Sequence, residues 1–430
     1  MIPAILGRFL TQVSSVLLSR SSLSSSPVPM RTDPKPSDPM PPIRQDHLWS
    51  AILVSTACIV GRVAWSGEIL TLPIALLLPA LWAAASNRMI VAAVTAGYFL
   101  SSSRGLPQGA AEFFGSSVWI GLLLWIAAAL PFVAVHAALW TKRGGWNGAG
   151  RYCLIQVMTA IPPLGVTGWA HPIATAGVLF PGCGWWGLVA TALGLCLMTT
   201  RLAPAVVLLA VMATAVSAAS WNKASTPEGW RGIDTAAGAA FGMAEAFEQQ
   251  QSVIARVREE AAEGGRVIVL PESTLGILTP TVERVWAEAL ADLDITVIAG
   301  AAVIDTEGYD SVMVMLNRTG AKILYRERMP VPVAMWQPWT SWFGLTGSAR
   351  ATVFGNPIVE IAGHRVAPLI CYEQLLVWPV LQSIFHRPDR IVAIANGWWA
   401  KDTSVPAIQR ASVEAWARLF DLPLVTAFNR

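Results

Sequence analysis

The stretch APLICYEQ, residues 367–374, decides how the rest of the chain is interpreted, because an apolar run here delivers first a cysteine and then a carboxylate. The run follows the turn-like 362–364 and predicts a strand covered on both faces, with Cys371 at its end. Two interpretations of this cysteine compete. Free cysteines are often buried as small apolar side chains, whereas a thiol at the edge of a sheet can act as a nucleophile.

The composition indicates that part of the chain lies in a membrane. Of the 430 residues, 54% are hydrophobic and 13% are charged, whereas ordinary soluble domains carry about 25% charged residues. The net charge of +3 is small for this length, so we expect no direct nucleic-acid binding. No cysteine pair or Cys/His cluster has the spacing of metal ligands, and we therefore expect no metal and no cofactor.

Residues 1–46 are rich in Ser and Pro and predict a disordered polar tail, because such a composition cannot bury a core. They contain no compact apolar segment followed by small residues, so no signal peptide is predicted. Residues 47–221 predict a transmembrane helical region, since a spanning helix needs about 17 to 25 residues and about seven apolar stretches are candidates. They are 48–66, 69–86, 88–102, 116–140, 152–168, 174–199 and 202–220, the third being short enough to be re-entrant instead.

Basic residues between these stretches predict the orientation, because cytoplasmic loops collect Lys and Arg. If the tail is cytoplasmic, the inner loops hold Arg88, Lys142, Arg143, Arg151 and Arg201. With seven crossings of a bacterial inner membrane, everything after Trp221 then lies in the periplasm; six or eight crossings would reverse this.

Residues 222–430 predict an α/β domain, because charges return and β-like runs alternate with helical patterns. Helices are predicted at 241–263, 282–292 and 407–420, with a short helix after residue 371. The predicted strands are 266–270, 296–303, 311–317, 321–325, 366–371, 391–396 and 424–428.

Three of these strands end in a polar residue, namely Glu272, Cys371 and Asn396. Reactive groups of α/β sheets collect beyond the carboxyl ends of the strands, so we expect these three to converge. A thiol attacks as the thiolate, and a Glu with a raised pKa in a dry pocket can take its proton. Cys371 is the only cysteine outside the apolar membrane stretches, and the pairing with Glu272 favours a nucleophile over a core residue.

Five blocks extend this interpretation, and they resemble those of the nitrilase (carbon–nitrogen hydrolase) superfamily in its membrane-tethered branch. They are LPES at 270–273, YDSVMVMLNRTG at 309–320, YRERMPVP at 325–332, LICYE at 369–373 and NGWW at 396–399. The same branch contains bacterial apolipoprotein N-acyltransferase. In residues 101–115 and 330–339, the chain is most similar to the members that serve plasmid conjugal transfer.

The resemblance implies an αββα sandwich for residues 222–430, behind the membrane helices. It also implies partners, which are the lipid bilayer, a lipid or peptide acyl donor, an amine acceptor and other conjugative transfer proteins. Members of the family continue beyond the position of Arg430, so we expect a smaller sheet here, with an edge left for a partner.

The family's catalytic triad is Glu, Lys and Cys, and its motifs place Glu272 as the base and Cys371 as the nucleophile. Glu327 stands where the lysine is expected, and Met335 where the acyltransferase has a further Glu. An arginine cannot transfer a proton near neutral pH but can stabilise an oxyanion, so Arg326 or Arg328 could replace part of the lysine's role.

Five further residues are site candidates through the same motifs. Glu373 is expected to support the site, although an isolated Glu in this position is also typical of a helix start. The substrate-binding candidates are Tyr372, Asn396, Trp398 and Trp399. The two tryptophans would line an acyl or peptide groove or merely pack, and Asn396 could simply orient a turn.

Two functions from different classes follow. The first is a membrane-bound N-acyltransferase or amidase that forms a thioester on Cys371. The second is a catalytically weakened nitrilase-like scaffold of the conjugative transfer apparatus, which the replaced lysine favours.

Overall fold

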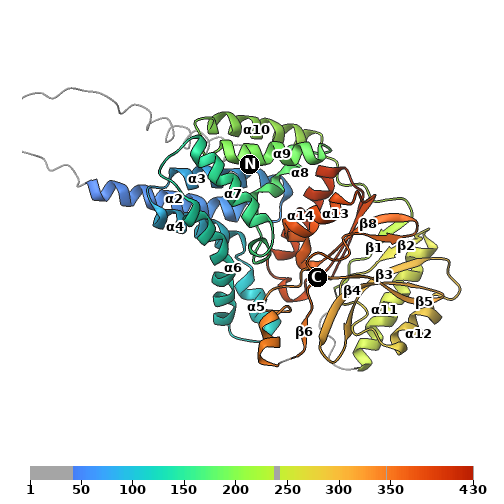
Figure 1. The fold of residues 1–430 in the computed structure, drawn as a ribbon. Coiled ribbons are helices and arrows are strands. Elements are labelled where there is room, and N and C mark those ends of the chain that lie inside the picture. Colours follow the sequence, from blue (N-terminus) through green and yellow to red (C-terminus); the bar gives the residue numbers. More distant parts are fainter. Residues whose placement is uncertain (1–41, 237–242, 345, 430) are drawn as a thin grey trace, which may run out of the picture. The chain divides into compact units, whose positions relative to one another are not determined.

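The computed structural model describes residues 42–236, 243–344 and 346–429 (Figure 1). The chain forms two compact units, residues 1–51 and 52–430, and the second contains every element from α3 onward. Most of the predicted polar tail lies outside the described residues. Its last residues, 42–46, are helical instead, because helix α2 runs from Pro42 to Ala64.

The N-terminal half of the second unit is helical. Its longer helices are α3 (Leu78–Ala84), α4 (Arg88–Ser102), α5 (Leu106–Phe114), α6 (Val118–Leu139), α7 (Trp146–Ala160), α9 (Gly184–Leu197) and α10 (Ala203–Ala219). Short turns of helix join them, namely η2 (Ile69–Leu77), η3 (Leu164–Val166), η4 (Pro172–Thr175) and α8 (Ala176–Leu179).

Two helices are long and apolar enough to cross a membrane, Asp46–Ala64 and Val118–Leu139. Only 28% and 22% of their residues are buried. Both helices therefore expose apolar side chains, such as Leu123 and Leu130 on α6. The remaining apolar helices of the described chain have 10–17 residues, and helix length therefore does not confirm seven crossings. The predicted span 174–199 is broken between α8 and α9, where Gly182 and Gly184 adopt positive φ angles.

The C-terminal half is built on two mixed sheets. The first has the order β1-β2-β3-β4-β5, with β6 paired to β4, and the second has the order β10-β9-β8-β7. The strands of the first sheet are β1 (Trp230–Gly232), β2 (Val267–Val269), β3 (Thr296–Ile304), β4 (Gly308–Asn317), β5 (Gly320–Arg326) and β6 (Ser348–Ala349). Those of the second are β7 (Val359–Ile361), β8 (His364–Ile370), β9 (Arg390–Asn396) and β10 (Leu424–Asn429).

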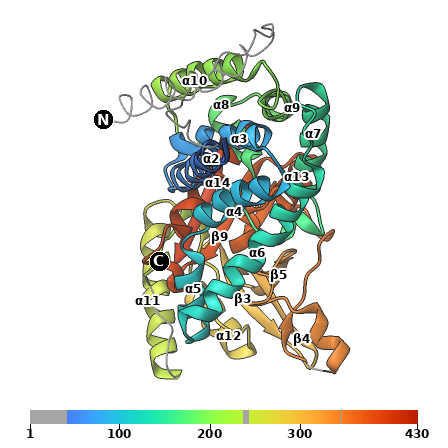
Figure 2. The ribbon, with the colours of Figure 1, turned by 90° about the vertical axis from the view of Figure 1, so that its left-hand side faces the viewer.

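The two sheets pack face to face around one apolar core. Side chains from both meet there, such as Val269 and Ile298 of the first sheet and Ile370 and Ile394 of the second. The other face of the first sheet packs on α11 (Met243–Ala262) and α12 (Pro280–Ala289), through Val257 and other residues. On the second sheet, α13 (Val377–Phe385) and α14 (Val405–Phe420) form the outer layer. This is the expected αββα sandwich (Figure 1), which lies behind helices α4 and α6 in the view of Figure 2.

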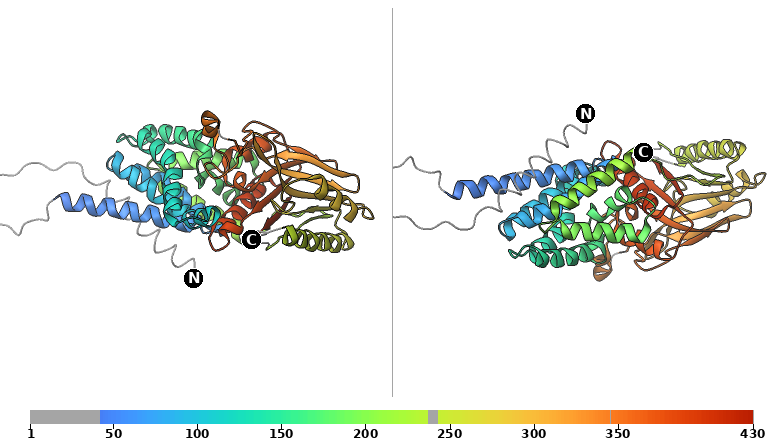
Figure 3. Two further views of the ribbon diagram at one scale, coloured as in Figure 1. Left: turned by 90° about the horizontal axis from the view of Figure 1, so that it is seen from below. Right: turned by 90° about the horizontal axis from the view of Figure 1, so that it is seen from above.

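Within residues 52–430, the helical half and the sandwich are in direct contact (Figure 3). Helix α8 packs so closely on α14 that a Cβ on Gly177 would lie 1.8 Å from the carbonyl oxygen of Ala415. The hydroxyl of Tyr372, in the turn η6 (Cys371–Leu375), donates to the carbonyl of Val166 at 3.1 Å. The two remaining turns are η5 (Pro338–Phe343) and η7 (Trp398–Ala400). The side of the sandwich that carries η6 therefore faces the helical half.

Candidate active site

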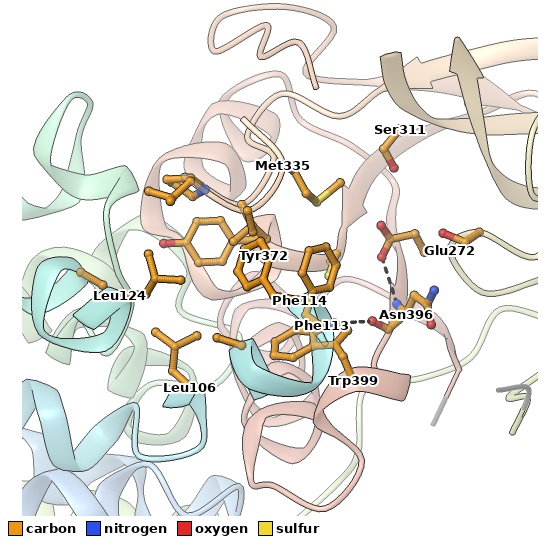
Figure 4. Close-up of a pocket in the computed structure, with 18 of the residues that line it drawn as sticks. Leu106, Phe113, Phe114, Leu124, Glu272, Ser311, Met335, Tyr372, Asn396 and Trp399 are labelled. Carbon is orange, nitrogen blue, oxygen red and sulfur yellow. Dashed lines mark hydrogen bonds between the residues drawn. The ribbon is translucent and has the colours of Figure 1, made fainter. Parts of the chain in front are cut away.

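Glu272, Cys371 and Asn396 meet at the carboxyl ends of β2, β8 and β9, as their sequence positions predicted. The backbone N–H of Asn396 donates to Oε2 of Glu272 at 3.0 Å (Figure 4). The Glu272 carboxyl and the Cys371 thiol lie close enough for each to affect the pKa of the other. A carboxyl and a thiol, each less than a tenth exposed, thus form a pair that can exchange a proton.

Cys371 occupies a strained turn rather than the last position of the strand. Its φ angle is +46°, in the left-handed region that costs a non-glycine residue about 1–3 kcal/mol and that recurs at active sites. Directly after β8, the chain turns into η6, which carries the sulfur out of the sheet. Gln409 of α14 donates to this sulfur at 3.7 Å. Gln409 could not be predicted from the sequence, because its contact with the sulfur depends on the packing of α14.

Glu373 holds this turn in place from behind. Its fully buried carboxylate accepts the backbone N–H of Ile370 at 2.8 Å and that of Arg328 at 2.9 Å. It also accepts the hydroxyl of Tyr325 at 2.6 Å. With these donors satisfying its oxygens, Glu373 is a positioning residue for the nucleophile.

Burial determines the pKa of Glu272. It raises the pKa of this carboxyl to about 7, with a smaller contribution from the charge of Glu373, while the donors at Cys371, Asn396 and Ser311 act in the opposite direction. Gly300 of β3 allows this close packing, since a Cβ there would lie 2.4 Å from Cα of Glu272. A carboxyl with this pKa is suited to proton transfer near neutral pH.

The thiol of Cys371 is protonated in the resting site. Burial raises its pKa well above the usual value, and the neighbouring charges of Glu272 and Glu327 act in the same direction. A thiol of this kind becomes a nucleophile only when a base removes its proton during the attack. Glu272 is the neighbouring carboxyl that can do so.

The two arginines considered as replacements for the lysine are both engaged elsewhere, and neither lines the cavity described below. Arg326 forms an ion pair with Asp310 and is 38% exposed. Arg328 is fully buried and donates to Tyr325, Gln382 and Ser383 at 2.8–3.0 Å.

Replacing Arg328 with alanine is expected to destabilise the fold by about 3–5 kcal/mol, because it leaves the buried Glu373 carboxylate without its counter-charge. Arg328 lies 3.6 Å from that carboxylate, and both side chains are 0% exposed. The measurement is thermal unfolding of the purified protein in detergent.

The matched control is Arg326→Ala, which removes the partly exposed pair with Asp310 and should cost about 0–1 kcal/mol. Equal losses in the two variants would contradict the structural role of the Arg328 network.

A cavity of about 420 Å³ opens in front of Cys371 and Glu272, and its wall is mainly apolar (Figure 4). The sandwich contributes Tyr372, Asn396, Trp398 and Trp399, all four of the substrate-binding candidates. Asn396 interacts with Glu272 through its backbone, while its side chain accepts from Asn429 at 2.9 Å. Three residues with positive φ, Ser273, Val333 and Cys371, line the same cavity.

Helices α5 and α6 supply the opposite wall, which the sequence did not reveal. Residues 101–115 contain no span, yet 106–114 form a short helix whose side chains line the cavity: Leu106, Ala110, Phe113 and Phe114. Helix α5 lies so close to η7 that a Cβ on Gly109 would be 2.5 Å from the ring of Trp399. The apolar spacing within LPQGAAEFF was the one available signal.

Among the described residues, no group of three or more His, Cys, Asp or Glu side chains could hold a metal ion.

Comparisons with known proteins agree with this geometry. Residues 120–418 match the family model described as "Carbon-nitrogen hydrolase". The "Probable conjugal transfer protein TraB" of Sinorhizobium fredii is 52% identical over 387 residues, covering 90% of this chain and 100% of the relative. The "Conjugal transfer protein TraB" of Agrobacterium fabrum is 51% identical over 397 residues, covering 90% and 94%.

Solved structures give a weaker likeness. A mutant amidase of the nitrilase superfamily from Nesterenkonia is 12% identical, with a TM-score of 0.34, over 47% of this chain and 78% of the amidase.

Proposed function

This chain belongs to the carbon-nitrogen hydrolase family, and from that premise we propose that it is a membrane-bound, cysteine-dependent N-acyltransferase or amidase. The observation that carries the proposal is the position of the Glu272–Cys371 pair at one end of an apolar cavity. A strained nucleophile, a base with a pKa of about 7 and an apolar binding site are the parts that acyl transfer requires.

The proposed reaction begins when Glu272 takes the proton of the Cys371 thiol as the sulfur attacks the carbonyl carbon of the acyl donor. The new S–C bond pushes the carbonyl electrons onto oxygen. When this intermediate collapses, the bond to the leaving group breaks and Glu272 returns the proton to that group. An amine or water then attacks the thioester on Cys371 while Glu272 takes a proton from it. The C–S bond breaks, Glu272 returns the proton to the sulfur, and the product is an amide or an acid.

The acyl group of the donor is proposed to be a lipid chain or another apolar group, because the wall opposite Cys371 consists of apolar side chains of α5 and α6. A tryptophan in place of Ala127 should fill part of the cavity, since Ala127 lines it from α6. We expect acylation by a long-chain p-nitrophenyl ester to fall by at least about ten-fold, the effect of losing roughly 1.4 kcal/mol of binding. Acylation by the acetyl ester should change little.

Leu130→Trp is the matched control, because Leu130 is on the same helix, is exposed and does not line the cavity. If Ala127→Trp slows the acetyl and the long-chain ester equally, the cavity does not hold the acyl chain.

The proposal places the chain in a bacterial inner membrane as a multi-pass protein, with residues 222–430 on the periplasmic side. It is supported by the low burial of the helices 46–64 and 118–139 and by the basic loops, which predict a cytoplasmic tail. A C-terminal alkaline phosphatase fusion is expected to be active, since this reporter folds on the oxidising side of the membrane. Activity of a C-terminal cytoplasmic reporter instead would overturn the orientation.

The biological role proposed is in plasmid conjugal transfer, the role that the names of the two relatives state. Partners would be other conjugative transfer proteins.

The alternative is a scaffold without catalysis, and Glu327 in place of the family lysine is the observation that favours it. Mating frequency with the catalytic variants separates the two functions, as the Discussion describes.

A further inference from the structure

Gln409 is a buried polar side chain of α14 that the reaction above does not use. It is 3% exposed and lies among apolar residues of the same helix, such as Ile408 and Val413. Burying an amide costs free energy unless the amide is hydrogen-bonded. Its Nε2 donates to Sγ of Cys371 at 3.7 Å. A buried donor is therefore directed at the proposed nucleophile.

The packing of α14 fixes the position of this donor. Before Gln409 in the helix, Ala407 contacts Gly67, where an added Cβ would lie 2.5 Å from the Cβ of Ala407. After Gln409, Ala415 packs closely against Gly177 of α8. These two contacts with the helical half anchor the segment that carries Gln409, which keeps its amide beside the sulfur.

The charged groups close to the sulfur are carboxyls. Glu272 after β2 and Glu327 after β5 act on the thiol directly, and Glu373 follows it in η6. Helix α13 has no charged residue. The charged side chains of α14 have other neighbours, since Arg410 pairs with Asp234, Arg418 stacks on Trp221 and Glu414 is near Lys223. Strands β8 and β9 carry His364, Arg365 and Arg390 at their first residues, remote from Cys371. These surroundings disfavour a thiolate, and Gln409 is the neutral donor that the structure brings to it.

We propose that Gln409 stabilises the thiolate of Cys371 through its amide N–H and directs the proton of the resting thiol toward Glu272. Its place in catalysis rests on the acyl-transfer function above, whereas its contact with the sulfur can be tested without that function. Hydrogen bonds to an ionised atom are stronger than those between neutral groups. The contact therefore strengthens as the sulfur gains charge.

The direction of the thiol proton follows from the chemistry of the amide. The NH₂ group of a glutamine only donates, so the S–H cannot point at Nε2. The neighbouring acceptor is the carboxyl of Glu272. As the sulfur attacks, its proton passes to Glu272 and the S–C bond forms, while Gln409 keeps both of its protons. The same N–H stabilises the leaving thiolate when the C–S bond of the thioester breaks.

The test follows alkylation of Cys371 by iodoacetamide in the full-length protein in detergent, with the modified peptide quantified by mass spectrometry. The variants are made in Glu272→Gln, because this removes the titration of the base and leaves the ionisation of the thiol to set the pH dependence. Gln409→Met removes the N–H and keeps the length of the side chain. Losing one hydrogen bond to a charged atom should lower the thiolate fraction about ten-fold. Since a more basic thiolate is also more nucleophilic, we expect alkylation at mildly alkaline pH to slow about three-fold.

Gln409→Leu also lacks the N–H and should behave like Gln409→Met. Ser412→Ala is the matched control, because Ser412 is buried on the same helix and its hydroxyl has no hydrogen-bond partner among the described residues. Its alkylation rate should be that of the Glu272→Gln parent. With the native Glu272 restored, Gln409→Met should also slow acylation by a p-nitrophenyl ester.

A merely structural effect has the opposite sign, because a loosened site exposes the sulfur and speeds up alkylation. Alkylation of Gln409→Met and Gln409→Leu at or above the rate of Ser412→Ala would overturn the donor role. A wild-type protein that is alkylated at Cys371 but acylated by no ester would overturn the acyl-transfer function. Slower alkylation in the two variants would then still support the contact between Gln409 and the sulfur.

Discussion

Replacing Cys371 with alanine is expected to abolish thioester formation. The measurement is mass spectrometry of the protein after exposure to a long-chain p-nitrophenyl ester. The sulfur is the atom that bonds to the acyl group, and no other nucleophile occupies the strained turn at φ +46°. Loss of the nucleophile reduced turnover by about 10⁶ in a serine protease, so acylation should fall below detection.

Cys183→Ala is the matched control. Cys183 is an exposed free cysteine that does not line the cavity, so this variant should acylate like the wild type. A thioester that persists in Cys371→Ala would place the nucleophile elsewhere.

The same variant tests the biological role. In a donor strain that lacks the wild-type copy, Cys371→Ala is expected to reduce mating frequency to the level of the deletion. Transfer at the wild-type frequency, with the protein present at normal levels in the membrane, would support the scaffold and contradict a catalytic role in conjugation.

Replacing Glu272 with glutamine is expected to slow acylation by about 10²–10⁴, the usual contribution of a general base. Because the carboxylate is the active form and its pKa is about 7, wild-type acylation should rise as pH increases through about 7. In Glu272→Gln this rise should disappear, leaving a low rate that depends on the ionisation of the thiol. The measurement is the acylation rate from mildly acidic to mildly alkaline pH.

Stability provides an independent check on that pKa. Since burial raises the folded pKa of Glu272 above the unfolded value of about 4.3, the folded state binds more protons between the two values. The contribution of Glu272 to the free energy of unfolding is therefore fully present below a pH of about 4.3 and is lost as pH rises through about 7. Glu272→Gln should weaken this pH dependence.

An unchanged rise in acylation through pH 7 in Glu272→Gln would show that Glu272 is not the base.

Much of the sandwich follows from local pattern. Buried strands such as 390–396 are continuous apolar runs, and helices such as α14 carry apolar residues at helical spacing. Their limits agree with the predicted ones to within a few residues. Short edge strands such as β1 and β7 were missed, since three residues carry no period that can be recognised.

The sequence by itself determined the family and the pair Glu272 and Cys371, because each follows a strand and carries its own chemistry. Only the tertiary structure decided what surrounds them. It placed Arg326 and Arg328 in ion pairs away from the cavity, made Glu373 the support of the turn and buried the Glu327 carboxyl without a hydrogen-bond partner among the described residues. Helix α5 became a wall of the cavity. The physical reason is that the period of a strand or helix is local, whereas desolvation and hydrogen-bond satisfaction depend on contacts between residues distant in the chain.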